Sequence, residues 1–209
     1  MAPFVVNERN IREFRNAEAF YTWLAQHHDS ADEVWIKLHK AGSGLPSITA
    51  KEAIDVVLCW GWIDGIRKGF DTQSFLQRYT RRGRTSIWSQ VNVDNVARLI
   101  EEGRMTEHGL REVERAKADG RWDRAYAAGA KLETPPALLA AITAEPAALA
   151  TYERLNATNR FALAFRVHNL KTEAGRAKRI ADYVEMLKRG ETIYPQDLDK
   201  PPAKAKRSP

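Results

Sequence analysis

The sequence predicts an α+β fold in which a small antiparallel sheet with helices is followed by an all-helical C-terminal extension. All six tryptophans lie before residue 123, which places the heaviest aromatic packing in the first part of the chain. Alternation of apolar and polar side chains, typical of half-buried strands, occurs before residue 90. After that point the apolar residues recur at helical spacing in an alanine-rich segment.

The first part should begin as loose chain and continue as helix, strand and helix. Asn16 can cap a helix that runs to about residue 26, with apolar side chains three and four positions apart. Residues 33–40 then alternate as a strand. Thr49 opens a capping-box pattern for the next helix, and Gly61 is placed to end that helix.

A β-hairpin should follow the second helix. Residues 62–68 and 74–81 are predicted to be strands, and residues 69–72 between them suit a hairpin turn. The second of these strands has mixed faces, one aromatic and the other basic and polar. Apolar periodicity and capping residues predict the remaining helices over residues 94–102, 106–120, 137–142, 146–155, 160–167 and 172–188.

Composition divides the chain into three parts. With 44% hydrophobic and 29% charged residues it is an ordinary folded protein. We expect an aromatic and basic α+β module over residues 1–126 and a helical module over residues 127–190, with the boundary in the flexible stretch 127–135. Residues 191–209 are predicted to be a disordered basic tail, which either keeps the protein soluble or weakly attracts nucleic acid and anionic surfaces.

The sequence also predicts where the protein resides. No apolar run approaches the roughly 18 residues that a membrane span needs. The N-terminus lacks a basic region followed by an apolar one, so we expect no secretory signal. The lone Cys59 follows apolar residues, which predicts a small buried side chain and leaves no intramolecular disulfide. A cytoplasmic protein without membrane insertion is therefore expected.

Several short motifs occur in order along the chain, namely Trp60–Gly65, Tyr79–Arg82, Ser86–Ser89, Leu99–Thr106, Ala118–Tyr126 and Lys171–Ile180. In these motifs the chain resembles the YdeI/OmpD-associated family of bacterial proteins, over roughly residues 10–190. The resemblance implies a YjbR/CyaY-like or DUF1801-type α+β module with a helical extension. It associates the chain with bacteriocin protection, which is a phenotype and names no chemistry. Residues 167–176 depart from the family pattern, because they keep its basic end but lack its first alanine–lysine pair.

The candidate site lies in Trp60–Ser89, where aromatic and basic side chains are concentrated and only Asp64 and Asp71 oppose the positive charge. Arginine forks suit phosphate or carboxylate, and tryptophan offers a stacking surface. In a hairpin Arg67 and Arg78 could approach each other, which is unfavourable unless an anion or acids intervene. The alternative is a solvated basic face with acids from other elements. The predicted ligand-binding residues are Trp62, Asp64, Arg67, Arg78, Arg81, Arg82 and Trp88.

Three functions fit this pattern. The first is a non-catalytic binding or stress (bacteriocin) protection protein, whose Arg/Trp-lined site holds an anionic small molecule or an acidic protein segment. The alternative is a nucleic-acid-binding protein, for which binding would depend steeply on salt. The second alternative is an uncharacterised enzyme using Asp64 as an acid or base. A carboxylate is costly to bury unpaired, so Asp64 either pairs with Arg67, Arg78 or Arg81 or has such a functional role.

The sequence assigns no catalytic residue, metal site or cofactor. Its histidines are adjacent or far apart, which does not suit a metal site. The loop over residues 41–47 has two glycines but lacks the Lys-Ser/Thr pair of a phosphate loop. This loop could still border a ligand site, because backbone N–H groups in such turns can face an anion.

Overall fold

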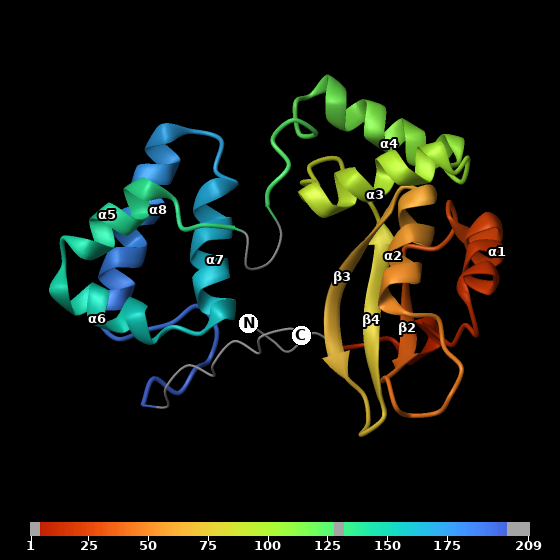
Figure 1. Ribbon diagram of the computed structural model, residues 1–209, viewed down its shortest axis with the longest axis horizontal. Coiled ribbons are helices and arrows are strands. Elements are labelled where there is room, and N and C mark those ends of the chain that lie inside the picture. Colours follow the sequence, from red (N-terminus) through yellow and green to blue (C-terminus); the bar gives the residue numbers. More distant parts are fainter. Residues whose placement is uncertain (1–4, 128–131, 200–209) are drawn as a thin grey trace. The chain divides into compact units, whose positions relative to one another are not determined.

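The structure of the chain is a computed structural model that describes residues 5–127 and 132–199. The chain divides into two compact units, Met1–Ala125 and Tyr126–Pro209. The first unit holds a sheet with helices, whereas the elements described in the second are all helices (Figure 1). This arrangement confirms the predicted α+β class. Within the described ranges, no helix is both long enough and apolar enough to cross a membrane.

The sheet has the strand order β1-β2-β4-β3. β4 (Ser74–Arg81) lies between β2 (Glu33–His39) and β3 (Trp62–Gly69) and is antiparallel to both. β1 (Ile11–Arg12) pairs parallel to β2, so the sheet is mixed rather than purely antiparallel. The sequence predicted only the three long strands, because a two-residue strand is too short to show alternation.

Two helices, α1 (Ala17–His27) and α2 (Ala50–Cys59), pack their apolar side chains on one face of the sheet. Both begin as predicted. The Asn16 side chain accepts a backbone N–H of α1, and Thr49 forms a capping box with Glu52. Burial of each large apolar side chain stabilises the fold by roughly 1.5–3 kcal/mol. This first core contains Phe20, Leu24, Val34, Ile36, Leu38, Ala53, Val56, Val57 and Tyr79.

A second apolar cluster joins α2 to α3 (Gln90–Glu101) and α4 (Glu107–Ala118). The side chains of Ser89 and Thr106 cap the two helices by accepting backbone N–H groups of their first turns. The predicted helix at residue 94 therefore begins earlier, at Gln90, because its cap is Ser89. The cluster contains Leu58, Cys59, Trp88, Val96, Leu99, Val113 and Ala116.

The second unit consists of α5 (Pro136–Thr143), α6 (Pro146–Arg154), α7 (Ala157–His168) and α8 (Glu173–Lys188). All four were predicted, with boundaries that differ by a few residues. Asn156 caps α7 by accepting the Asn159 N–H, although the sequence offered either Asn156 or Thr158 as the cap. The four helices share one core, which contains Leu138, Ile142, Ala148, Tyr152, Leu163, Val167, Tyr183, Val184 and Leu187.

The chain beyond α8 packs back onto the second unit. Ile193 and Leu198 contact its core, and the Asn159 side chain, which is 1% exposed, donates to the Tyr194 carbonyl oxygen at 3.1 Å. Residues 191–199 are therefore held by both apolar and polar contacts. The remainder of the predicted basic tail, from Lys200 onward, lies outside the described residues.

Candidate functional site

A pocket of about 280 Å³ opens in the first unit, at the corner where α2 gives way to β3. We call it the tryptophan pocket. The end of α1, the end of β4 and the first turns of α4 complete its walls. Its lining residues are His28, Asp29, Trp60, Gly61, Trp62, Arg81, Arg82, His108, Arg111 and Glu112.

Gly61 makes the corner possible. Its φ of +71° lies in the left-handed region, which glycine adopts without steric penalty. A Cβ at this position would also lie 2.9 Å from Glu112 Cγ and 3.0 Å from the His108 carbonyl oxygen. The glycine therefore serves both the turn from α2 to β3 and the close approach of α4. The sequence predicted the first role but not the second.

The first turn of α4 is anchored to the end of α2. Thr106 Oγ1 donates to the Cys59 carbonyl oxygen at 2.6 Å while it accepts the Gly109 N–H at 3.3 Å. Gly109 has no side chain to keep the two backbones apart, and a Cβ there would lie 2.4 Å from the Cys59 carbonyl oxygen. This contact fixes where His108 and Arg111 enter the pocket.

Aromatic rings form a large part of the lining. The imidazole rings of His28 and His108 lie with their centroids 4.0 Å apart. Trp60 contacts both of them, at 4.8 Å from His28 and stacked at 5.6 Å from His108. Trp62 is buried, and its Nε1 donates to the His28 carbonyl oxygen at 3.2 Å. These rings offer a stacking surface at the mouth of a short pocket.

His108 is held as a neutral imidazole. The Arg111 guanidinium donates to His108 Nδ1 at 2.7 Å, so this nitrogen acts as an acceptor. Burial lowers the pKa of His108 from its ordinary value of 6.5, and the neighbouring His28 and Arg111 lower the pKa further. The Nδ1 of His28 donates to the Leu24 carbonyl oxygen at 3.1 Å, which holds that ring against His108.

Arginines outnumber acids in the lining, by three to two. Arg81 donates to the Asp29 carbonyl oxygen at 3.0 Å and pairs with the exposed Asp32. Arg82 is 5% exposed, and its guanidinium lies 3.6 Å from the Trp88 ring centroid. Glu112, one of the two acids, is paired with Arg115. The pocket is therefore suited to an anion rather than a cation.

The structure brings together only some of the predicted ligand-binding residues. Trp62, Arg81 and Arg82 line the tryptophan pocket, whereas the other four do not. Trp88 is buried, packed edge-on against Trp122 at 4.9 Å and beneath Arg82. It supports the pocket wall from behind.

Asp64 lies on β3 outside the pocket. Desolvation by the surrounding protein atoms raises the pKa of its carboxyl group, while Arg82 and Arg67 counteract this rise. The residue as a whole is nevertheless exposed, so water screens its charge. The geometry an Asp64 enzyme would need, with the carboxylate and arginines lining one pocket, is not present in the tryptophan pocket.

The expected approach of Arg67 to Arg78 does not occur. A bulge between Asp64 and Arg67 sets Arg67 opposite Gln77, and Arg67 Nε donates to Gln77 Oε1 at 3.0 Å. Neighbouring side chains of a strand alternate between faces, so Arg78 points to the other face of the sheet. There it pairs with Glu33 at 2.6 Å. An acid from another strand thus neutralises Arg78. This pairing agrees with the alternative prediction, in which acids from other elements offset a solvated basic face.

The sequence reasoning missed the contributions of α1 and α4. The C-terminal end of α1 supplies His28, and the first turns of α4, far away in the chain, supply His108, Arg111 and Glu112. The sequence features that could have indicated them are the cap residue Thr106 and Gly109 three residues later. Together they mark the start of a helix whose first turn can pack closely against another backbone. No group of three or more His, Cys, Asp or Glu side chains in the described residues could hold a metal ion.

Two family models match different parts of the chain. Residues 131–190 match the family model described as "Bacteriocin-protection, YdeI or OmpD-Associated". Residues 12–112, which carry the tryptophan pocket, match a domain of unknown function, DUF8412. The first match supports the family resemblance in the helical unit and is consistent with a role associated with bacteriocin protection. The YjbR/CyaY-like or DUF1801-type module stays a prediction. No curated protein and no solved structure matched the chain.

Proposed function

We propose that the protein is a non-catalytic binding protein that holds a small anion in the tryptophan pocket, in a role associated with bacteriocin protection. The observation that carries this proposal is the convergence of Arg81, Arg82 and Arg111 on a pocket with an aromatic lining. The link to bacteriocin protection rests on the family match of the helical unit. Its anionic ligand is inferred from the pocket alone.

The charge of the lining favours an anion. Arg81 is held in place by Asp29 and Asp32, so its guanidinium is oriented before a ligand arrives. Arg111 makes its hydrogen bond to a neutral imidazole, which leaves its positive charge uncompensated by that contact. A phosphate, sulfate or carboxylate group would accept charge-assisted hydrogen bonds from such guanidinium groups.

The lining chemistry suits binding of an anion. Three guanidinium groups supply hydrogen-bond donors, and imidazole and indole rings supply an aromatic surface, while Glu112 is engaged by Arg115. The aromatic surface of Trp60 and the two imidazoles would stack against a planar ligand. The pocket therefore suits a compact anion or the acidic side chain of a partner segment.

Isothermal titration calorimetry with inorganic sulfate, inorganic phosphate and an acidic peptide tests the proposal. Arg111→Ala should weaken binding by about tenfold or more, because a charge-assisted hydrogen bond contributes roughly 1.5–3 kcal/mol. Lys117→Ala is the matched control. It removes the same charge from an exposed position on the same helix, and Lys117 does not line the pocket.

Two results would overturn the proposal. One is that no anion in the panel binds. The other is that Arg111→Ala and Lys117→Ala weaken binding equally, since that would reflect net charge alone. Gel shifts with DNA and RNA address the nucleic-acid alternative. Binding that falls steeply with salt and is unaffected by Arg111→Ala would favour that alternative.

A further inference from the structure

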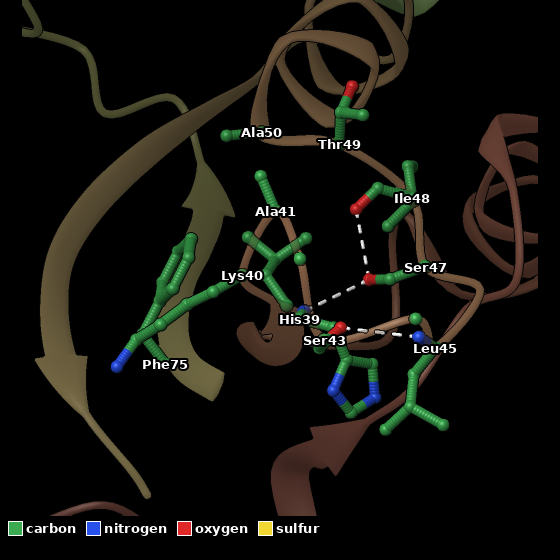
Figure 2. A pocket seen from close by; sticks show the side chains of 13 residues that line it. His39, Lys40, Ala41, Ser43, Leu45, Ser47, Ile48, Thr49, Ala50 and Phe75 are labelled. Atoms are coloured by element: carbon green, nitrogen blue, oxygen red, sulfur yellow. Dashed lines mark hydrogen bonds between the residues drawn. The ribbon is translucent and has the colours of Figure 1, made fainter. Parts of the chain in front are cut away.

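A second pocket, of about 370 Å³, lies between the loop that leads from β2 to α2 and the strand β4 (Figure 2). We call it the loop pocket. Its volume falls within the range of roughly 300–1,000 Å³ that is usual for small-molecule sites. It shares no residue with the tryptophan pocket. Its lining residues are Leu38, His39, Lys40, Ala41, Gly42, Ser43, Gly44, Leu45, Ser47, Ile48, Thr49, Ala50 and Phe75.

Part of this lining is apolar and belongs to the first core. Leu38 and Ile48 are each 1% exposed, and Phe75 lies directly opposite Leu38 in the pairing of β2 with β4. Phe75 itself is only partly buried, so an edge of the core is open to the pocket. An apolar group placed there would lose contact with water and gain contact with these three side chains.

The charge of the loop pocket is positive. Its lining contains no aspartate or glutamate, and Lys40 supplies an ammonium group. Lys40 Nζ donates to the carbonyl oxygens of Asp71 at 3.3 Å and Thr72 at 2.9 Å, and its side chain extends past Phe75 (Figure 2). Because an ammonium group has three N–H donors, one remains for a ligand.

The acids nearest the pocket have partners other than Lys40: Glu13 pairs with Lys37 at 3.0 Å and lies 3.5 Å from His39 Nε2. The guanidinium of Arg67 lies 4.2 Å from the centroid of the Phe75 ring, which adds a second cation beside the pocket. Glu52 follows the lining at the start of α2, but its carboxylate accepts the Thr49 N–H and hydroxyl group, each at 2.8 Å. Lys40 itself forms no ion pair within the part of the chain that the structure describes.

The loop holds its shape through its own hydrogen bonds. Ser47 Oγ accepts the His39 N–H at 3.2 Å and donates to the Ile48 carbonyl oxygen at 3.1 Å (Figure 2). Ser43 Oγ accepts the Leu45 N–H at 3.2 Å. These bonds restrict the loop to one conformation, which lowers the entropic cost of binding.

We propose that the loop pocket binds a small organic acid, with the carboxylate on Lys40 and the apolar body against Leu38, Ile48 and Phe75. Each part of this ligand is chemically complementary to one part of the lining. The carboxylate completes the hydrogen bonding of an ammonium group without an acidic partner, and the apolar body covers the open edge of the core. A cation would meet no counter-charge there.

Titration of the full chain with butanoate, hexanoate and octanoate, and with the alcohols of the same lengths, tests this proposal. Affinity should rise with each methylene by up to about fourfold, as expected for burial of a CH₂ group, until the pocket is filled. The carboxylates should bind about tenfold more tightly than the alcohols, because only they bring a negative charge to the Lys40 ammonium group. Backbone amide signals of Gly42 and Gly44 report the site by NMR.

Three variants separate the contributions. Lys40→Gln should reduce carboxylate affinity to that of the alcohols, whereas Lys51→Gln, an exposed lysine that does not line the pocket, should leave affinity unchanged. Ala50→Leu fills the pocket and should abolish binding of both series. Arg111→Ala, in the tryptophan pocket, should have no effect, so failure here is distinct from failure of the proposed function.

Equal affinity for acids and alcohols would overturn the role of Lys40. Unchanged binding in a correctly folded Ala50→Leu variant would overturn the site, as would the absence of binding by all three acids. Circular dichroism establishes the folded state of each variant.

Discussion

Substitution of Gly109 by alanine should destabilise the first unit and displace α4. A Cβ at this position would lie 2.4 Å from the Cys59 carbonyl oxygen and 2.7 Å from that of Leu58. Both atoms are backbone atoms at the end of α2, so neither can rotate away. Because ordinary contacts begin near 3.4 Å, α4 would have to move by about 1 Å at its first turn.

The loss of folding free energy that this movement causes can be estimated from the close packing of α4 on α2. Overpacking in a close-packed interior costs typically 1–3 kcal/mol, and a clash with rigid backbone belongs near the upper end, about 3 kcal/mol. For a unit of this size we expect the midpoint of thermal unfolding to fall by about 10 °C. The Thr106 hydrogen bond to Cys59 O, 2.6 Å long, should weaken at the same time.

Thermal unfolding followed by circular dichroism measures this effect, with Gly69→Ala as control. Gly69 has no atom within 4 Å of a built Cβ and has no positive φ, so its substitution should change stability by less than about 0.5 kcal/mol. Since His108 and Arg111 move with α4, Gly109→Ala should also weaken sulfate binding. A Gly109→Ala variant as stable as the Gly69→Ala control would refute the described packing of α4 on α2.

Three further predictions concern individual residues. Burial raises the pKa of Cys59 to about 11, so its thiol should react with a disulfide reagent only after unfolding, and fast reaction of the native protein would contradict its burial. The pKa of His108 is lowered on folding, so the unfolded chain takes up the proton first. Its contribution to stability should be complete above about pH 6.5 and fall as the pH drops below that value, and His108→Gln should flatten this slope in urea titrations. Thr49→Ala removes the capping box of α2 and should cost about 1 kcal/mol in the same assay, whereas an unchanged midpoint would show that the cap contributes nothing.

Local signals predicted much of the fold. Asn16, Thr49 and Thr106 each begin a helix through a hydrogen bond to a residue three positions later, so a short stretch of sequence contains the whole interaction. The strands over residues 33–39 and 74–81 could be predicted because alternation of side chains between the two faces of a strand depends only on residues two positions apart. Each of these predictions depends on residues that are neighbours in the sequence.

The site could be predicted only in part, because it depends on contacts between distant segments. Arg81 lines the pocket, yet its partner Asp32 lies on another segment of the chain. The pairing of His28 with His108 depends on Gly61 and Gly109, whose missing side chains let α4 approach α2. Periodicity and capping contain no information about such backbone contacts.

The hairpin shows the same limit on a smaller scale. The strand boundaries were predicted closely, but the bulge between Asp64 and Arg67 was not. The extra residue shifts the pairing register by one, so Arg67 lies opposite Gln77 rather than Leu76 and contacts its side chain. The predicted approach of Arg67 to Arg78 was wrong although the strands were predicted, because the two side chains lie on opposite faces of the sheet.

The central claim, that an anion binds in the tryptophan pocket, is tested most directly by NMR of the histidine rings during titration with inorganic sulfate. The imidazole signals of His28 and His108 and the indole N–H of Trp60 should shift together and saturate with one dissociation constant. His168, in the second unit, should stay unchanged and serves as an internal control. Sulfate binding that leaves the signals of His28 and His108 in place would contradict the claim.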